Sequence, residues 1–172
     1  MLIAHTPRLC LRRFCPEDLD PLALILSDPE VMYFSRTRQP LSRAEAADLI
    51  HHQSRPNHPH GLYAVTAQAS GELLGYCGLI HQQIDGHTEI EIGYRLGRSH
   101  WGQGFATEAA CAVRDHAARL GIPRVISLIE AANERSRRVA EKVGMQWQRE
   151  IVIDAIVVQV YGMDLVQEGT RG

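Results

Sequence analysis

Apolar and polar residues alternate along several short segments of the chain, and a period of two residues is typical of strands. Two of the turns between these segments, Ser70-Gly71 and Asp85-Gly86, are of the short kind that joins neighbouring antiparallel strands. We therefore expect an antiparallel meander over residues 62–96. In full, the pattern predicts strands at residues 8–14, 62–67, 73–80, 88–96, 125–129, 147–153 and 156–165.

Helical spacing of apolar residues separates these strands at four places. Pro16, followed by two acidic residues, favours a helix start, and Ser42 with Glu45 forms a capping box ahead of a second helix. The third helix ends at Gly121, and Asn133 is placed to cap the fourth. The predicted helices span about residues 17–26, 43–50, 105–120 and 134–143.

The length of 172 residues is that of one domain, so residues 1–172 are expected to form a single unit. With 18 basic and 20 acidic residues the net charge is −2, and no basic excess indicates a nucleic-acid partner. The longest apolar run, residues 151–158, contains Asp154 and is too short to span a bilayer, so no membrane partner is expected. The first residues lack the features of a secretory signal, which predicts a cytoplasmic protein.

The most informative segment is the glycine-containing stretch at residues 97–107, between a predicted strand and a predicted helix. Small residues at Gly102, Gly104 and Ala106 let a ligand approach the backbone closely. The first N–H groups of the following helix have no partner within the helix, so an anion such as a diphosphate can bind them. An ordinary strand-to-helix turn is the alternative interpretation.

Two other kinds of phosphate loop are excluded by spacing. The chain has no Gly-Lys-Ser/Thr sequence, which excludes the Walker type, and the dinucleotide pattern Gly-x-Gly-x-x-Gly fails at Thr107. The predicted order of elements also lacks the alternating parallel units of a dinucleotide-binding fold.

The motifs of the chain resemble those of the Gcn5-related N-acetyltransferases (GNAT), and in particular the ribosomal-protein N-terminal acetyltransferase (RimJ/RimL-like) branch. The central match is Tyr-Arg-Leu, four residues, and Trp-Gly-Gln-Gly-Phe-Ala-Thr-Glu-Ala at residues 94–109. Further matches cover nearly the whole chain: Thr6-Pro7-Arg8-Leu9, Leu11-Arg12, Asp28-Pro29-Glu30-Val31-Met32, Gly71 to Leu79, Glu91-Ile92-Gly93-Tyr94, Asn133-Glu134-Arg135-Ser136 and Glu141 to Met145.

The resemblance implies an α/β (α+β) GNAT fold, with a mixed, mostly antiparallel seven-stranded sheet flanked by about four helices. The sheet would splay between strands 4 and 5 and hold acetyl-CoA in the opening, as co-substrate and without a metal. Trp101 stands where the family pattern usually has Gln or Arg, which removes one side-chain donor. The residues expected to bind the cofactor are Tyr94, Leu96, Trp101, Gly102, Gln103, Gly104, Phe105, Ala106, Thr107, Asn133 and Ser136.

Acetyl transfer to an amine needs a neutral nucleophile and a proton for the departing thiolate. The resemblance favours Glu91 as a base acting through water, with Glu89 second; solvated carboxylates on a strand face are the alternative. Ser136, near the start of a helix, is placed to donate a proton to the CoA sulfur, or else is an ordinary first-turn serine. Many relatives carry a tyrosine acid where this chain has Ala140. Other tyrosines without an assigned place are Tyr33, Tyr94 and Tyr161.

Two other chemistries are less favoured by the sequence. A covalent route through Cys77 or Cys111 lacks a base tied to either residue by a motif, and all four cysteines are expected to be free thiols. The histidines between His51 and His60 are interrupted by two prolines and show no ligand spacing, so a surface loop is expected there rather than a metal site. Three arginines are candidates for pairing with CoA phosphates: Arg98, Arg137 and Arg138.

An α-amino group titrates near pH 7.7 to 8.0 and a lysine near 10.4, so a neutral lysine costs about 3.5 kcal/mol more at neutral pH. This difference and the branch resemblance favour a protein N-terminal amine as acceptor, in a groove walled by residues 30–35 and the loop between the last two strands. A small-molecule amine, such as a polyamine, an antibiotic or an amino-acid derivative, stays open as an alternative acceptor. A noncatalytic acyl-CoA-binding module and a nucleotide-binding protein also stay open. The chain is expected to act as a monomer or homodimer.

Overall fold

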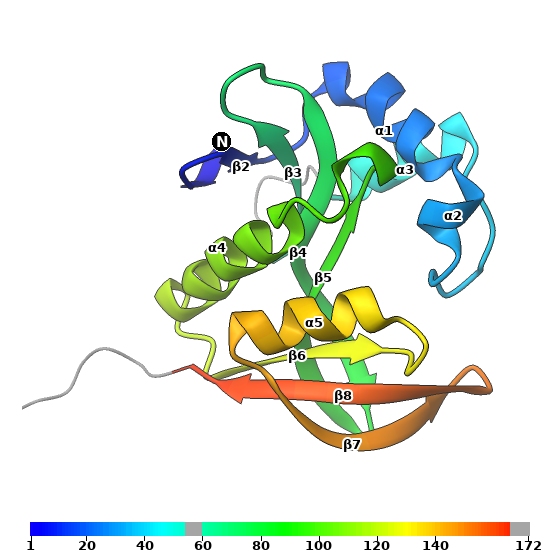
Figure 1. Ribbon diagram of the computed structural model, residues 1–172, viewed down its shortest axis with the longest axis vertical. Coiled ribbons are helices and arrows are strands. Elements are labelled where there is room, and N and C mark those ends of the chain that lie inside the picture. The colour runs from blue at the N-terminus through cyan, green and yellow to red at the C-terminus, as the bar shows by residue number, and fades with distance from the viewer. Residues whose placement is uncertain (54–59, 166–172) are drawn as a thin grey trace, which may run out of the picture.

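Eight strands form one mixed sheet within residues 1–53 and 60–165, the part of the chain that the computed structural model describes (Figure 1). Their order in the sheet is β1-β2-β3-β4-β5-β6-β8-β7, and every neighbouring pair is antiparallel except β5 and β6. The strands are β1 (Leu2–His5), β2 (Leu9–Arg12), β3 (Leu62–Ala67), β4 (Leu73–Ile84), β5 (His87–Leu96), β6 (Arg124–Ile129), β7 (Gln146–Ile153) and β8 (Ile156–Asp164).

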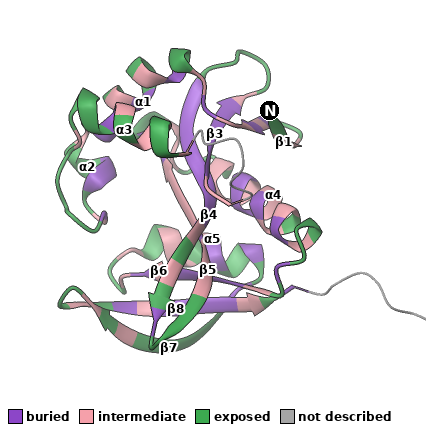
Figure 2. Ribbon diagram, turned by 180° about the vertical axis from the view of Figure 1, so that it is seen from behind, coloured by how far each residue is buried: buried purple, intermediate pink, exposed green. Residues whose placement is uncertain are grey.

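Helices cover both faces of this sheet. The short helix η1 (Pro16–Asp18) leads into α1 (Leu19–Leu26), and α2 (Pro29–Met32) and α3 (Arg43–Gln53) complete the cover of one face. Helix α4 (Phe105–Arg119), preceded by η2 (Arg98–His100), and helix α5 (Glu134–Val143) lie on the other face. Two core clusters reflect this division, because alternate residues of β3 and β4 belong to different clusters. Figure 2 shows the buried stretch of β3 and β4 between the two helical layers.

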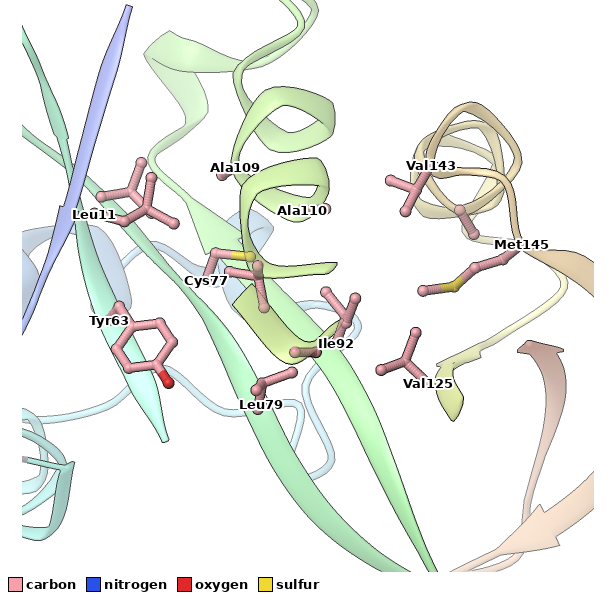
Figure 3. Close-up of a cluster of buried hydrophobic side chains, with 14 of the residues drawn as sticks. Leu11, Tyr63, Cys77, Leu79, Ile92, Ala109, Ala110, Val125, Val143 and Met145 are labelled. Carbon is pink, nitrogen blue, oxygen red and sulfur yellow. The ribbon is translucent and has the colours of Figure 1, made fainter. Parts of the chain in front are cut away.

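The alanine-rich face of α4 is the side that packs on the sheet. Ala109 and Ala110 are buried and face Cys77 and Ile92 on the neighbouring strands (Figure 3). Alanine has no bulk beyond Cβ, so the helix lies close to β4 and β5.

The sheet separates between β5 and β6. Strands β4 and β5 pair continuously from Gly75 opposite Leu96 to Ile84 opposite His87, whereas β5 and β6 share one backbone pair, Glu91 with Ile126. In Figure 1, β6, β8 and β7 run across the direction of β4 and β5. This confirms the predicted splay, because β5 and β6 correspond to the fourth and fifth predicted strands.

The fold class is as predicted, with eight strands where seven were expected. The additional strand is β1, whose four residues are too few to show a period and which is defined by its pairing with β2. Helix α2 was also not predicted. Helix α3 continues to Gln53, so the expectation of a loop was wrong for His51 and His52, while residues 54–59 lie outside the described residues.

The predicted helix signals are present in the structure. The Ser42 N–H donates to Glu45 Oε2 at 2.7 Å, and the Glu45 N–H donates to Ser42 Oγ at 3.2 Å, which is a reciprocal capping box. Asn133 Oδ1 accepts a hydrogen bond from the Ser136 N–H at 3.2 Å at the start of α5. All four cysteines are free thiols. No helix among the described residues has the length and apolar character needed to cross a membrane.

Candidate active site

A cavity of about 620 Å³ follows the splay between β5 and β6 and is lined from both faces of the sheet. On the side of α4 and α5 its wall includes Trp101, Gly104 and Ser136. On the side of α1 and α2 it includes Phe34 and Tyr76. Consecutive residues of β5 point to opposite faces, so this strand contributes side chains to both parts of the cavity.

The segment between β5 and α4 presents free backbone donors to this cavity. Gly102 and Gly104 adopt φ of +73° and +82°, a region that glycine enters without strain. Among the described residues, no backbone group accepts a hydrogen bond from the N–H groups of residues 102–107, whereas the next residue, Glu108, donates to the Gly104 carbonyl at 3.0 Å. An added Cβ at Gly102 would meet nothing within 4 Å. The segment is therefore an open cradle of donors at the start of a helix, suited to a diphosphate.

Trp101 and Arg8 hold this cradle from two sides. The Trp101 indole Nε1 donates to the Leu96 carbonyl at 2.9 Å, which ties the segment to the end of β5. The Arg8 guanidinium donates to the Gln103 carbonyl at 2.9 Å and lies 4.4 Å from the centre of the Phe105 ring. The indole that replaces the usual Gln or Arg thus has a structural partner, and the role of Arg8 was not predicted.

The edge of β5 that faces the splay presents the backbone groups of Ile92, Tyr94 and Leu96. The Ile92 carbonyl accepts from Ser127 Oγ at 2.9 Å, and the Leu96 carbonyl accepts from Trp101. Alternate residues of a strand direct their backbone groups to the same side, so those of Tyr94 point into the opening as well. The backbone near Leu96 was expected to pair with an extended ligand arm. Because the Leu96 carbonyl already binds Trp101, the backbone of Tyr94 is the group that can pair with such an arm.

Two hydroxyl groups lie near the start of α5. The Tyr94 hydroxyl donates to the Ser136 carbonyl at 3.2 Å, and both residues line the cavity together with Asn133. Burial raises the pKa of Tyr94 well above its usual value, so the phenol stays protonated at neutral pH. The structure therefore brings Tyr94, Asn133 and Ser136, three of the residues expected to bind the cofactor, together in the wall of the cavity.

Glu91 lies at the single pair that joins β5 to β6. Its Oε2 accepts from Gln82 Nε2 at 2.6 Å and its Oε1 from the Leu128 N–H at 3.3 Å. Burial raises the pKa of Glu91, and these hydrogen bonds and the charges of Arg36 and Arg95 offset the increase only in part. A carboxylate with a raised pKa is the form of base that neutral pH requires. Gln82 was not predicted, because its contact with Glu91 depends on the register of β4 and β5.

The second glutamate candidate lies elsewhere. Glu89 does not line the cavity and pairs with Arg124 at 3.3 Å, on the outer part of β5. Two residues along a strand share a face, but β5 is paired differently at the two positions, and only Glu91 reaches the splay.

The expected walls of the acceptor groove do line the cavity. Phe34 comes from the segment after α2, and Asp154 from the turn between β7 and β8. The ion pair of Arg36 with Asp154 at 3.3 Å joins these two walls, and the ion pair of Arg38 with Glu130 at 2.6 Å joins the segment after α2 to the end of β6. The cavity is thus enclosed by segments that are far apart in the sequence.

A model of the acetyltransferase (GNAT) domain family matches residues 8–146 of the chain. The chain belongs to the GNAT acetyltransferase family. It is 36% identical to the uncharacterized protein YkkB of Bacillus subtilis strain 168, over 85% of this chain and 86% of that protein. It is 31% identical to the uncharacterized N-acetyltransferase p20 of Bacillus licheniformis, over 83% of this chain and 81% of that protein.

Among solved structures, the ribosomal L7/L12 α-N-protein acetyltransferase RimL, in complex with coenzyme A, superposes with a TM-score of 0.80. The match covers 98% of this chain and 100% of that chain at 19% identity, a likeness of fold. These relationships confirm the family indicated by the motifs. The protein is accordingly an acetyl-CoA-dependent acyltransferase of the GNAT family.

Several other candidates of this GNAT chain lie outside the cavity. Tyr33 is 60% exposed and Tyr161 is buried in the core, and neither lines the cavity. Arg98 pairs with Glu30 and Asp28. Arg137 does not line the cavity, whereas Arg138 does.

The cysteine and histidine candidates are also separate from the GNAT cavity. Burial raises the pKa of Cys77 far above its usual value, and neither Cys77 nor Cys111 lines the cavity. His60 Nδ1 lies 2.6 Å from His81 Nε2. Within residues 1–53 and 60–165, no group of three or more potential ligands is arranged to hold a metal ion.

Proposed function

We propose that the protein transfers the acetyl group of acetyl-CoA directly to a protein N-terminal α-amino group. One observation carries this proposal: the free N–H groups at the start of α4 and the buried carboxylate of Glu91 open into the same cavity. The first feature suits a diphosphate, and the second suits an amine that must lose a proton.

The residues present fit acetyl-CoA, which supplies the activated acetyl group. The N–H groups of residues 102–107 would hold the diphosphate, and the backbone of Tyr94 and the side chain of Asn133 would hold the pantetheine arm. Arg135 and Arg138 line the cavity and add positive charge near the phosphates. The Arg135 guanidinium stacks 3.7 Å from the centre of the Trp101 ring, which fixes its position beside the cradle.

Glu91 would remove the proton of the acceptor amine through a water molecule. Gln82 and the Leu128 N–H orient its carboxylate, and burial keeps its pKa raised. Ser136 or Tyr94 would donate the proton that the departing thiolate takes up. Both hydroxyls stay protonated at neutral pH, and Tyr94 would have to exchange its hydrogen bond to the Ser136 carbonyl for one to the thiolate.

The choice of an α-amino acceptor is supported by the presence of one candidate base, Glu91, in the site. One carboxylate with a raised pKa suffices for an amine of pKa near 8, whereas a lysine costs about 3.5 kcal/mol more to deprotonate at neutral pH. The fold is shared with RimL, whose own name describes a protein α-amino acceptor. Phe34 and Asp154 of the β7–β8 turn line the acceptor side of the cavity, where the end of a chain would enter.

The test measures release of the CoA thiol with a panel of acceptors. Short peptides with a free N-terminus are compared with the same peptides blocked at the N-terminus, with a lysine-containing blocked peptide and with polyamines. We expect turnover with the free N-terminal peptides only. Turnover confined to small amines would move the assignment to a small-molecule acetyltransferase, and CoA binding without any thiol release would indicate a noncatalytic module.

A further inference from the structure

Several charged side chains on the acceptor side of the cavity form ion pairs, and among the described residues Arg95 and Glu91 lack one. Glu30 pairs with Arg98, Arg36 with Asp154 and Glu130 with Arg38. Arg95 also lines the cavity but forms no ion pair within 4.0 Å of any described carboxylate. An unpaired guanidinium beside a half-enclosed cavity is an anion-binding group.

Arg95 is held with its donors available. Its Nη1 donates to the Tyr76 hydroxyl at 2.9 Å, and its guanidinium carbon lies 5.9 Å from the centre of the Tyr76 ring. Tyr76 is the residue opposite Arg95 on β4, so this contact holds the guanidinium close to the strand position of Arg95. A guanidinium has five N–H groups, so most of them are left to bind a ligand.

Gly93 separates Arg95 from Glu91 on the same face of β5. An added Cβ at Gly93 would come within 2.6 Å of Ile80 Cδ1, so this position is directed toward the acceptor side and carries no side chain into it. The face of β5 therefore presents a carboxylate, a glycine covered by the apolar side chain of Ile80, and a guanidinium in that order. A ligand that complements this order carries an amine at one end and an anion at the other.

We propose that the acceptor carries a carboxylate that Arg95 binds while Glu91 receives the amine. This inference rests on the proposed function and narrows it to protein N-termini with an acidic side chain at the second or third residue. Strand residues rise about 3.3 Å each, which separates the Cα atoms of residues 91 and 95 by about 13 Å. The carboxylate of Glu91 turns toward Gln82 and Leu128, away from Tyr76. The two groups are thus too far apart for the adjoining amine and carboxylate of a free α-amino acid.

The experiment compares peptides that begin Ser-Asp or Ser-Gly-Asp with counterparts in which Asn replaces Asp, using CoA release as readout. Asn keeps the shape of the side chain and removes only its charge. We expect kcat/KM to be at least tenfold higher for the better Asp peptide than for its counterpart, mainly through a lower KM. Equal values for both pairs would overturn the inference, and so would faster turnover of free aspartate than of either peptide.

Variants then test whether Arg95 is responsible. In Arg95→Met the preference for Asp should disappear, while Arg95→Lys, which keeps the charge, should retain part of it. Arg149→Met is the control, because that exposed guanidinium pairs with Asp85 and does not line the cavity, and the preference should stay as in the unaltered protein. Acetyl-CoA affinity and Tm, measured on each variant, should match the unaltered protein.

The outcomes separate this inference from the proposed function. If Arg95→Met slows Asp and Asn peptides equally, Arg95 acts through Glu91 or through the fold, and the inference is wrong. If Asn peptides are acetylated as well as Asp peptides, only the inference fails. If no peptide with a free N-terminus is acetylated, both the proposed function and this inference are wrong.

Discussion

Arg8, which precedes β2, is bound through both its backbone and its side chain to Glu108 in the first turn of α4. The Arg8 N–H donates to Glu108 Oε1 at 2.9 Å, and Arg8 Nε donates to Oε2 at 2.7 Å. Thr6 Oγ1 donates to the same carboxylate at 2.6 Å. Since Arg8 also binds the Gln103 carbonyl, this carboxylate links the first strands of the fold to the cradle at the start of α4.

Glu108→Ala should therefore weaken acetyl-CoA binding without touching the cavity. The variant removes the hydrogen bonds that Thr6 and Arg8 donate to the carboxylate. The Arg8 donors are exposed and can bind water, and Thr6 Oγ1 can donate to the Leu9 carbonyl, so the loss of stability should be about 1 kcal/mol. We expect a lower Tm and a KM for acetyl-CoA raised by about tenfold, measured by steady-state kinetics. Arg43→Met, which removes an exposed ion pair with Asp20, is the control and should change neither quantity. We call the hydrogen bonds of Glu108 with Thr6 and Arg8 the clamp. An unchanged KM in Glu108→Ala would show that the clamp does not shape the cradle.

The clamp also predicts a dependence of stability on pH. Partial burial alone would raise the pKa of Glu108, but hydrogen bonds from Thr6 and Arg8 outweigh it and hold the pKa below 4.5. A carboxyl group with a pKa lowered by folding stabilises the fold above its unfolded-state pKa, and this stabilisation is lost as the pH falls through the lower folded-state value. The Tm difference between the unaltered protein and Glu108→Gln should therefore narrow below about pH 4. A difference that stays constant with pH would exclude an electrostatic origin.

Glu91→Gln should slow turnover by about 100-fold at neutral pH if Glu91 is the base, with a smaller loss at higher pH, where more of the amine is already neutral. In the unaltered protein, kcat/KM should rise with pH through the raised pKa of Glu91. The matched variant is Glu89→Gln, since Glu89 lies on the same strand and does not line the cavity. Its rate should stay within about twofold of normal. A rate near normal in Glu91→Gln would remove the base assignment.

The same Glu91 substitution should stabilise the protein. Burial raises the pKa of Glu91, and a carboxyl group of this kind favours folding below its unfolded-state pKa and loses that contribution as the pH rises through the folded-state value. Glu91→Gln removes the buried charge, while its one side-chain oxygen can still accept from Gln82 and the weaker hydrogen bond from the Leu128 N–H is lost. Its Tm should exceed that of the unaltered protein at pH 8, and the gain should shrink at pH 5. A lower Tm at both pH values would contradict this account.

Gly102→Val tests the cradle with a control that has the same backbone strain. Gly102 and Gly121 have φ of +73° and +75°, and an added Cβ at either would meet no atom within 4 Å. Both substitutions should lower Tm to a similar extent, because a β-branched residue is strained at positive φ. Calorimetry should detect weaker acetyl-CoA binding, by about tenfold or more, in Gly102→Val only. Equal affinity in the two variants would remove the cradle from the proposed function.

Local signals in the sequence were enough for much of this fold. The capping box at Ser42, the cap at Asn133 and the small residues at Gly102 and Gly104 act within a few positions, so their spacing predicts the structure correctly. Strand β1 has no such signal, since four residues gain their order only from pairing with β2.

The details of the site depended on contacts between distant segments. Glu91 and Glu89 look alike in the sequence, and only the single pair between β5 and β6 distinguishes them. The clamp joins residues about a hundred positions apart in the sequence. Arg95 is distinguished from the other arginines only because those near it, such as Arg36, form ion pairs in the folded chain. Composition and spacing contain none of this information.

Under the proposed function, the separation of β5 from β6 determines the kinetic mechanism. The thioester carrier and the amine would approach from opposite faces of the sheet and meet in a shared opening, so neither obstructs the path of the other. Both can then be bound at once, and the acetyl group passes between them without stopping on the protein. Double-reciprocal plots at several concentrations of each substrate should accordingly intersect rather than run parallel.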